Sequence, residues 1–290
     1  EQLSPLSSRP TYTETENDLT VKANKRTFIF SKKDGQLKGV SVDNRKINFA
    51  NGPRFIGARR ADRSLDQFYN HDDEKAKEKD RTYSEFPDAA VFTKLDVKQD
   101  GGDLVVTANY KLGNLDKAQW TINPSGDLAL DYTYNFSGVV DLMGIRFDYP
   151  EDQVISKRWL GAGPYRVWQN RIHGTQYDVW ENDYNDPIPG ETFTYPEFKG
   201  YFGDVSWMNI QTKEGTISLT NETPDAYIGV YQPRDGRDRL LYTLPESGIS
   251  VLNVIPPVRN KVNSTDLCGP SSQPKWVNGP QTCLLYTSDA

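Results

Sequence analysis

Short stretches of alternating apolar and polar residues recur along most of the 290-residue chain, and tight polar turns separate them. Alternation with a period of two places the apolar side chains on one face of an extended strand. The turns carry Gly, Asp and Asn, which accept the positive φ angles of tight hairpins. No long amphipathic helix stands between these stretches, so the pattern predicts an all-β fold built from antiparallel hairpins.

The alternation predicts at least ten strands. We expect them in the segments Leu19–Ala23, Thr27–Ser31, Leu37–Val42, Val91–Val97, Leu104–Tyr110, Ala118–Ile122, Leu128–Phe136, Thr216–Thr220, Ala226–Tyr231 and Ile249–Val254. The charged stretch Asp72–Asp80 is expected to be a solvated helical turn or a loop. From Trp159 to Gly203 the alternation gives way to Gly, Pro, Asn and aromatic residues, which is typical of a long irregular segment that carries a binding site.

The composition changes near both ends of the chain. Residues 1–11 have the Ser and Pro content of a linker from a preceding domain, and residues 12–274 are expected to form one large double-layered domain. Residues 275–290 are expected to be a tail. Within it, residues 283–290, which read CLLYTSDA, are similar to the translation of a common transposase sequencing adapter. We therefore expect residues 283–290 to be a read-through scar on a gene fragment.

Charge and hydropathy exclude several classes of partner. The net charge is −6 and the chain has no long run of one sign, so it lacks the basic surface that nucleic acid or an anionic membrane requires. No segment approaches the ~20 apolar residues of a membrane-spanning helix. Two cysteines, Cys268 and Cys283, are too few for a disulfide framework and leave the redox compartment open. The 6 Trp and 16 Tyr predict either a sandwich core or a surface for sugar rings.

The segment Trp159–Arg171, which reads WLGAGPYRVWQNR, resembles the β-galactosidase small-chain signature W-x-G-x-G-P followed by E-N-Y-x-D-R. The residues that match are Trp159, Gly161, Gly163, Pro164 and Arg171. Arg166, Val167, Trp168 and Asn170 stand where Glu, Asn, Tyr and Asp are usual. With these differences, the segment is more similar to a variant branch of the family 2 glycoside hydrolases than to the usual signature.

Other segments extend the resemblance over about residues 12–273. Phe30–Leu37 is similar to the F-D-K-x-x-G-x-L that opens this domain, and Gly144–Phe147 to its G-x-x-F strand. Arg60–Asp66 only partly preserves the usual R-A-P-x-D-N-D. The resemblance implies an all-β, galactose-mutarotase-like β-supersandwich of antiparallel strands.

The resemblance also implies a function. Retaining glycoside hydrolases use two carboxyl groups about 5–5.5 Å apart, which in this family lie in a (β/α)₈ barrel of about 250 residues. This chain lacks the length and the βα alternation for such a barrel, so we expect the fragment to be inactive alone and to have no catalytic residue. Its partners would be carbohydrate and the catalytic barrel of the same parent chain. The resemblance to this family implies a periplasmic or secreted enzyme that acts on terminal sugars of oligo- or polysaccharides.

In the parent architecture the domain is expected to act as scaffold and to lend loops to the rim of the sugar pocket. The residues expected to contact substrate are Arg166, Trp168, Asn170, Arg171, Trp180, Glu181, Tyr184 and Glu197. Aromatic rings stack on pyranose faces, while Arg, Asn and Glu hydrogen-bond to hydroxyls. For each ring, packing into the core is the alternative role, and for Arg171 the alternative is an internal ion pair that fixes its loop. No metal or cofactor is expected.

Three other functions stay open from the residues. An aldose epimerase of the mutarotase fold would use a His and a carboxylate, and only His71 and His173 are available. A free-standing carbohydrate-binding module would bind a glycan without turnover. A polysaccharide lyase would pair His173 with Arg171. One departure places lactose in doubt as substrate: the family's D-D-S-W stretch is replaced by Cys268–Gln273, and only Trp276 beyond it could substitute.

Overall fold

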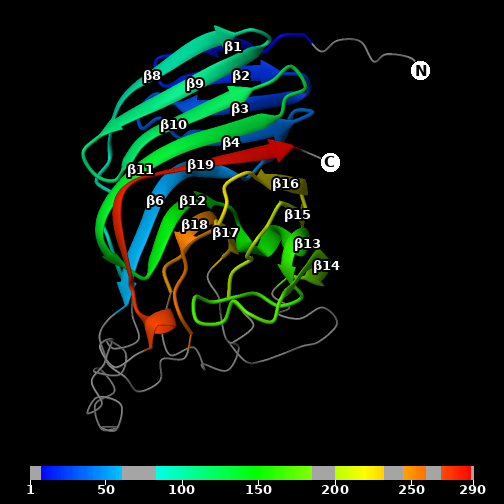
Figure 1. Cartoon of the computed structure of the whole chain (residues 1–290). Coiled ribbons are helices and arrows are strands. Elements are labelled where there is room, and N and C mark those ends of the chain that lie inside the picture. Colours follow the sequence, from blue (N-terminus) through cyan, green and yellow to red (C-terminus); the bar gives the residue numbers. More distant parts are fainter. Residues whose placement is uncertain (1–7, 61–82, 185–199, 232–243, 259–268, 289–290) are drawn as a thin grey trace.

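The computed structural model describes residues 8–60, 83–184, 200–231, 244–258 and 269–288. These residues form two antiparallel sheets with short 3₁₀ turns between strands (Figure 1). The ten-stranded sheet has the order β1-β2-β3-β4-β6-β12-β18-β17, with β5 beside β4 and β7 beside β6. Its strands are β1 (Thr11–Glu14), β2 (Asp18–Ala23), β3 (Arg26–Ser31), β4 (Leu37–Val42), β5 (Arg45–Ile47), β6 (Ala50–Arg60), β7 (Tyr83–Glu85), β12 (Leu142–Asp148), β17 (Tyr227–Val230) and β18 (Ile249–Val254).

The second sheet has nine strands in the order β14-β13-β15-β16-β19-β11-β10-β9-β8. Its strands are β8 (Val91–Asp100), β9 (Asp103–Lys111), β10 (Leu115–Ile122), β11 (Leu128–Val140), β13 (Val154–Gly163), β14 (Gln176–Asp183), β15 (Trp207–Thr212), β16 (Gly215–Asn221) and β19 (Lys275–Ser288). The predicted all-β antiparallel fold is confirmed, and every segment predicted to be a strand lies in one, with ends that differ by a few residues. The stretch Asp72–Asp80 lies outside the described residues.

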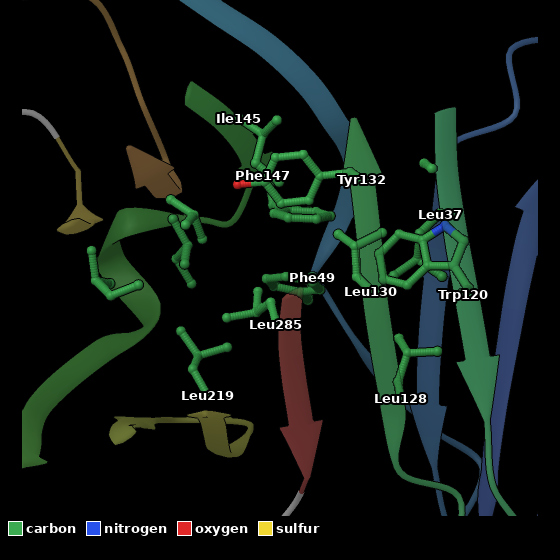
Figure 2. Packing of buried hydrophobic residues seen from close by; sticks show 14 of the residues in the cluster. Leu37, Phe49, Trp120, Leu128, Leu130, Tyr132, Ile145, Phe147, Leu219 and Leu285 are labelled. Carbon is green, nitrogen blue, oxygen red and sulfur yellow. The ribbon is translucent and has the colours of Figure 1, made fainter. Parts of the chain in front are cut away.

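Alternation along the strands builds the main core, which lies between the two sheets. In β11, Leu128, Leu130, Tyr132 and Tyr134 are all buried, while the residues between them are less so. Strands of both sheets contribute to one cluster. Figure 2 shows in it Leu37 from β4, Trp120 from β10, Leu130 from β11 and Phe147 from β12. Apolar burial of this kind supplies about 25 cal/mol per Å², which makes this cluster the main source of stability.

The segment Trp159–Gly203, predicted to be irregular, contains regular structure. Strand β13 extends to Gly163 and pairs with β14 over eight residue pairs, from Ser156 with Asp183 to Gly163 with Gln176. Strand β14 lies at the edge of the nine-stranded sheet and most of its residues are exposed. Only Trp180 and Asn182 on its inner face are covered, and one of these is polar, so the strand shows no clear apolar alternation and the sequence pattern missed it.

The residues predicted to be a tail form β19, which lies between β11 and β16 in the nine-stranded sheet (red in Figure 1). Thirteen register pairs join it to β11, from Leu128 with Thr287 to Val140 with Lys275. Leu285 is 3% exposed and packs in the main core. Pro280 lies where β19 pairs with β11 but not with β16, a place that tolerates the missing N–H. The described sheet therefore does not end at the predicted boundary, residue 274.

A second, smaller cluster covers the outer face of the ten-stranded sheet. Ile56 on β6, Leu142 on β12 and Leu252 on β18 point away from the main core and pack against buried residues of the connecting segments. Among those are Val167 and Trp168, from the loop between β13 and β14. The outer face of this sheet thus positions the segment that carries the signature.

Candidate functional site

The loop from Pro164 to Thr175, between β13 and β14, is called the signature loop from here on. It crosses from the nine-stranded sheet to the outer face of the ten-stranded one. Val167 and Tyr201 exchange two backbone hydrogen bonds, of 2.8 and 2.7 Å. This bridge fixes the first half of the loop against the segment before β15.

Trp168 lies at the centre of the second cluster. Its side chain is 1% exposed and packs edge-on against Tyr201, with ring centroids 5.8 Å apart and planes at 85°. Burial also raises the pKa of the Tyr201 phenol. Of the two roles considered for Trp168, the structure shows core packing, because a ring covered in this way has no face left for a pyranose.

Arg166 is also buried, at 5% exposed, and its guanidinium carbon lies 5.8 Å from the centre of the Phe202 ring. Phe202 in turn packs edge-on against Trp159, at 4.9 Å between ring centroids. The indole Nε1 of Trp159 donates to the carbonyl of Ala162 at 3.0 Å. Arg166 therefore lies over the Phe202 ring beneath the loop and supports its first turn.

Asn170 fixes the second half of the loop to the segment after β18. Its Nδ2 donates to the carbonyl of Val258 at 2.8 Å, and its Oδ1 accepts the N–H of the same residue at 2.9 Å. Next to it, the Gln169 N–H donates to the Pro256 carbonyl at 3.1 Å, and the Gln169 Nε2 to the Gln273 carbonyl at 2.7 Å. These bonds hold three segments that are distant in the sequence.

The exposed part of the loop is short and rigidly supported. Arg171, Ile172 and His173 are exposed, and the backbone of Arg171 pairs with Trp168 in an isolated bridge. We call these three residues the loop tip. The Arg171 side chain forms no ion pair with any residue that the structure describes, so the predicted alternative of an internal ion pair has no support there.

The other predicted contact residues lie on β14 or just after it. Trp180 is half-buried against Gly163, where an added Cβ would come within 2.3 Å of the indole. Tyr184 donates its hydroxyl to the carboxylate of Glu151, and the Lys157 ammonium lies 5.2 Å from its ring centre. Glu181 is exposed and faces Arg158 across the β13–β14 pair.

Two predicted positions, Glu197 and His71, lie outside the described residues. Trp276, considered as a substitute for the missing tryptophan, is 70% exposed at the start of β19. In the part of the chain that the structure describes, no three His, Cys, Asp or Glu side chains gather in a group that could hold a metal ion. None of the described helices has the length and apolar character needed to cross a membrane.

Comparison with protein families decides where the signature belongs. The family description "Beta galactosidase small chain" matches residues 22–255, which is most of the chain and includes the whole signature loop. The chain belongs to the β-galactosidase small-chain family. A comparison with the curated proteins finds no match.

Solved structures place this small-chain domain in the galactose-mutarotase-like fold. It is similar to galactose 1-epimerase from Lactobacillus acidophilus NCFM, with 9% identity, a TM-score of 0.52, and coverage of 97% of this chain and 98% of that one. It is also similar to the GalM/aldose epimerase homologue from C. elegans, with 8% identity, a TM-score of 0.44, and coverage of 93% and 97%. At such low identity the first likeness shows the fold alone, and it confirms the predicted supersandwich.

One structural residue of the small-chain domain gave no signal in the sequence. Asp141, 2% exposed between β11 and β12, accepts the Arg60 N–H at 2.9 Å and lies 3.5 Å from the Arg59 Nε. Arg60 opens the segment that was compared with R-A-P-x-D-N-D, and the rest of that segment lies outside the described residues. Asp141 therefore fixes the start of this family segment, which is the end of β6, to the turn between β11 and β12.

The small-chain domain also has an apolar row on the outer face of its nine-stranded sheet. Register pairs place Val179 beside Leu160 and Leu160 beside Trp207, and all three point away from the main core. Tyr177, 58% exposed, extends the row along β14. Val179 and Tyr177 lie on the edge strand and are exposed, whereas Leu160 and Trp207 are half-buried on the next two strands.

Proposed function

We propose that this chain is the scaffold and sugar-pocket rim of a retaining β-galactosidase-like glycoside hydrolase that acts on terminal sugars of oligo- or polysaccharides. The observation that carries the proposal is the loop tip: three exposed residues on a family-specific loop whose other half is buried and hydrogen-bonded. Rigid support of this kind lowers the ordering cost when the tip contacts a ligand.

The catalytic pair is assigned to another part of the parent protein. Retaining hydrolysis needs two carboxyl groups about 5–5.5 Å apart on either side of the glycosidic bond. The described strands pair only antiparallel in two sheets, whereas the family's barrel is built from parallel strands. In this proposal the chain alone contacts the sugar and supports the pocket, but it does not hydrolyse the glycosidic bond.

Within the rim, Arg171 is the residue proposed to contact substrate. Its exposed guanidinium offers several donors in one plane, which suits vicinal sugar hydroxyls. Trp168, Arg166 and Asn170 act behind it as positioning residues. The apolar row of Leu160, Val179 and Trp207 is proposed as the surface that contacts the catalytic barrel.

Steady-state kinetics on p-nitrophenyl β-D-galactoside test this proposal. The purified chain should give no turnover, and turnover by it would overturn the assignment of catalysis to a barrel. In the intact parent protein, Arg171→Ala should raise KM several-fold with a smaller change in kcat. Arg45→Ala, an exposed position on β5 in the other sheet and away from both the loop and the apolar row, is the matched control. Equal kinetics for Arg171→Ala and wild type would remove the loop tip from the rim.

A second candidate function, aldose epimerisation, is favoured by the likeness to galactose 1-epimerase. Epimerases of this kind need an acid–base pair at the anomeric carbon. In this chain the described histidine, His173, lies exposed at the loop tip. Polarimetry of freshly dissolved α-D-galactose tests the idea: acceleration of mutarotation that His173→Ala abolishes would replace the rim proposal by an epimerase.

We propose that the parent protein is periplasmic or secreted. Family resemblance supports this proposal. Fractionation of the source cells followed by immunoblotting tests it, and recovery of the protein in the cytosolic fraction would contradict it.

A further inference from the structure

A polar cavity of ≈ 720 Å³ lies beside β6 and β12, and none of its lining residues belongs to the signature loop. Its walls come from β4, β5, β6 and β12, from the 3₁₀ turn Glu151–Gln153, and from the residues that follow β17 and precede β18. This volume falls within the range of about 300–1,000 Å³ that small-molecule sites occupy. The cavity is therefore large enough for a ligand of one or two sugar rings.

Fixed charges cross-link the wall. Arg54 forms an ion pair with Asp148, and Asn51 donates its Nδ2 to the same carboxylate at 3.2 Å. Arg146 donates to the carbonyl of Glu246. These contacts hold the two guanidinium groups in place before any ligand arrives.

Several buried polar atoms of the wall lack a partner among the described residues. Tyr231 is 6% exposed, lines the cavity, and its hydroxyl has no hydrogen-bond partner there. The Nε atoms of Arg54 and Arg146 are also buried and also have no hydrogen-bond partner among the described residues. A buried donor without a partner costs about 1–3 kcal/mol. Other parts of the fold also hold such atoms, for example the Tyr110 hydroxyl and Gln169 Oε1, so these three support a ligand site only together with the cavity beside them.

The chemistry of the wall fits an uncharged polyhydroxyl ligand. Four basic and three acidic side chains line the cavity, so neither sign dominates. Tyr149 and Tyr231 add aromatic surface, and Tyr231 is held edge-on by Tyr184 at 5.9 Å between ring centroids. Closely mixed donors, acceptors and aromatic faces match the alternating hydroxyls and apolar faces of a sugar.

We propose that this cavity is a carbohydrate-binding site for a neutral mono- or disaccharide, separate from the rim at the loop tip. Tyr231 and the two arginines donate to sugar hydroxyls, while Asp148, Glu151 and Glu246 accept from them. The site has no role in bond cleavage. It stands independently of the proposed function, because a sugar bound here does not need the catalytic barrel.

Isothermal titration calorimetry on the purified chain tests the proposal with four probes: lactose, β-1,4-galactobiose, galacturonate and galactosamine. We expect one of the two neutral sugars to bind with a Kd in the millimolar range or tighter. Tyr231→Phe removes one hydroxyl and should weaken binding between about threefold and tenfold. Arg146→Gln should weaken it more than tenfold, since charged donors form stronger hydrogen bonds.

Tyr110→Phe is the matched control. The Tyr110 hydroxyl on β9 is also buried without a partner among the described residues, but it does not line the cavity. The Tyr110→Phe variant should bind the neutral sugar with the same Kd as wild type. The melting temperature of Tyr231→Phe should be unchanged or higher, which separates loss of binding from loss of fold.

Three results would overturn the proposal: no heat with either neutral sugar, a Kd that Tyr231→Phe and Arg146→Gln leave unchanged, or tighter binding of galacturonate or galactosamine than of the neutral sugars. Hydrolysis by the parent protein distinguishes this site from the rim. Tyr231→Phe should leave kcat and KM on the nitrophenyl galactoside unchanged, and a fall in kcat would place the cavity in the active site instead.

Discussion

The signature loop and the polar cavity contain similar side chains, yet Asn170 in the loop and Tyr231 in the cavity differ in how far their hydrogen bonds are satisfied. In the loop, the Asn170 amide makes two hydrogen bonds to the backbone of Val258 and Trp168 is packed on all sides. In the cavity, Tyr231 is almost as buried, but its hydroxyl has no partner among the described residues.

This difference has a physical meaning. A buried polar group that is satisfied internally contributes to one fixed structure, whereas an unsatisfied one keeps its binding capacity for a ligand. Aromatic and polar composition is thus a poor guide to a sugar site. Hydrogen-bond satisfaction distinguishes Asn170 from Tyr231, although the loop also contains a buried acceptor without a partner among the described residues, Gln169 Oε1. The variants below test what that distinction contributes.

The largest effect is expected at Trp168. Trp168→Ala should lower the free energy of unfolding by about 3–5 kcal/mol, because it opens a cavity under the loop. Urea denaturation followed by circular dichroism measures it. Trp207→Ala, on the half-buried outer row, is the control and should cost clearly less. A smaller loss at Trp168 than at Trp207 would mean that the loop is not part of the packed scaffold.

Asn170 should come next. Asn170→Ala leaves the Val258 N–H and carbonyl without their side-chain partner, and we expect a loss of about 1–3 kcal/mol in the same urea experiment. Asn170→Asp still accepts the N–H but sets a carboxylate oxygen against the Val258 carbonyl, so it should lose at least as much. Asn278→Ala removes an exposed hydrogen bond with Ser137 and should be nearly neutral. Equal losses for Asn170→Ala and Asn278→Ala would contradict the clamp.

The fold was largely predictable because most strands bury one face. β14 escaped prediction since few of its residues are buried, and β19 escaped since Gly279 and Pro280 interrupt its pattern. Strands of this kind are recognised by their partners rather than by their own residues. In β19, the long register with β11 and the burial of Leu285 provide that evidence.

The sites were less predictable than the fold. The signature located the loop, but the sequence could not tell whether Arg166 and Trp168 face solvent or the outer face of the other sheet. The cavity gave no signal, because Arg54, Arg146 and Tyr231 come from distant segments and each resembles an ordinary strand residue. Only the assembled fold brings their unsatisfied atoms to one wall.

Alkaline pH should weaken the region around the cavity. Burial raises the pKa of the Tyr149 phenol to about 12, assisted by the hydrogen bond to Glu214 and opposed by one from Thr212. The unfolded phenol ionises near pH 10, so the native state binds the proton more tightly between these values.

The stability that Tyr149 contributes is thus present below about pH 10 and lost as the pH rises toward 12. Thermal melts between pH 9 and pH 12 should show the loss as a falling melting temperature. Tyr149→Phe should reduce the slope, and Tyr12→Phe, an exposed position on β1, should leave it unchanged. Identical slopes for wild type and Tyr149→Phe would refute the assignment.

The smallest change in stability is expected at Tyr231, and it tests the comparison most directly. Tyr231→Phe deletes a buried hydroxyl without a described partner, so the free energy of unfolding should stay within about 0.5 kcal/mol or rise. Tyr134→Phe deletes a buried hydroxyl that donates to Asn253 at 2.6 Å, and it should cost about 1 kcal/mol. Both variants keep the ring and its packing, so the difference between them isolates the hydrogen bond. If Tyr231→Phe cost as much as Tyr134→Phe, the Tyr231 hydroxyl would already be satisfied within the chain, and the cavity would lose the donor on which its sugar site depends.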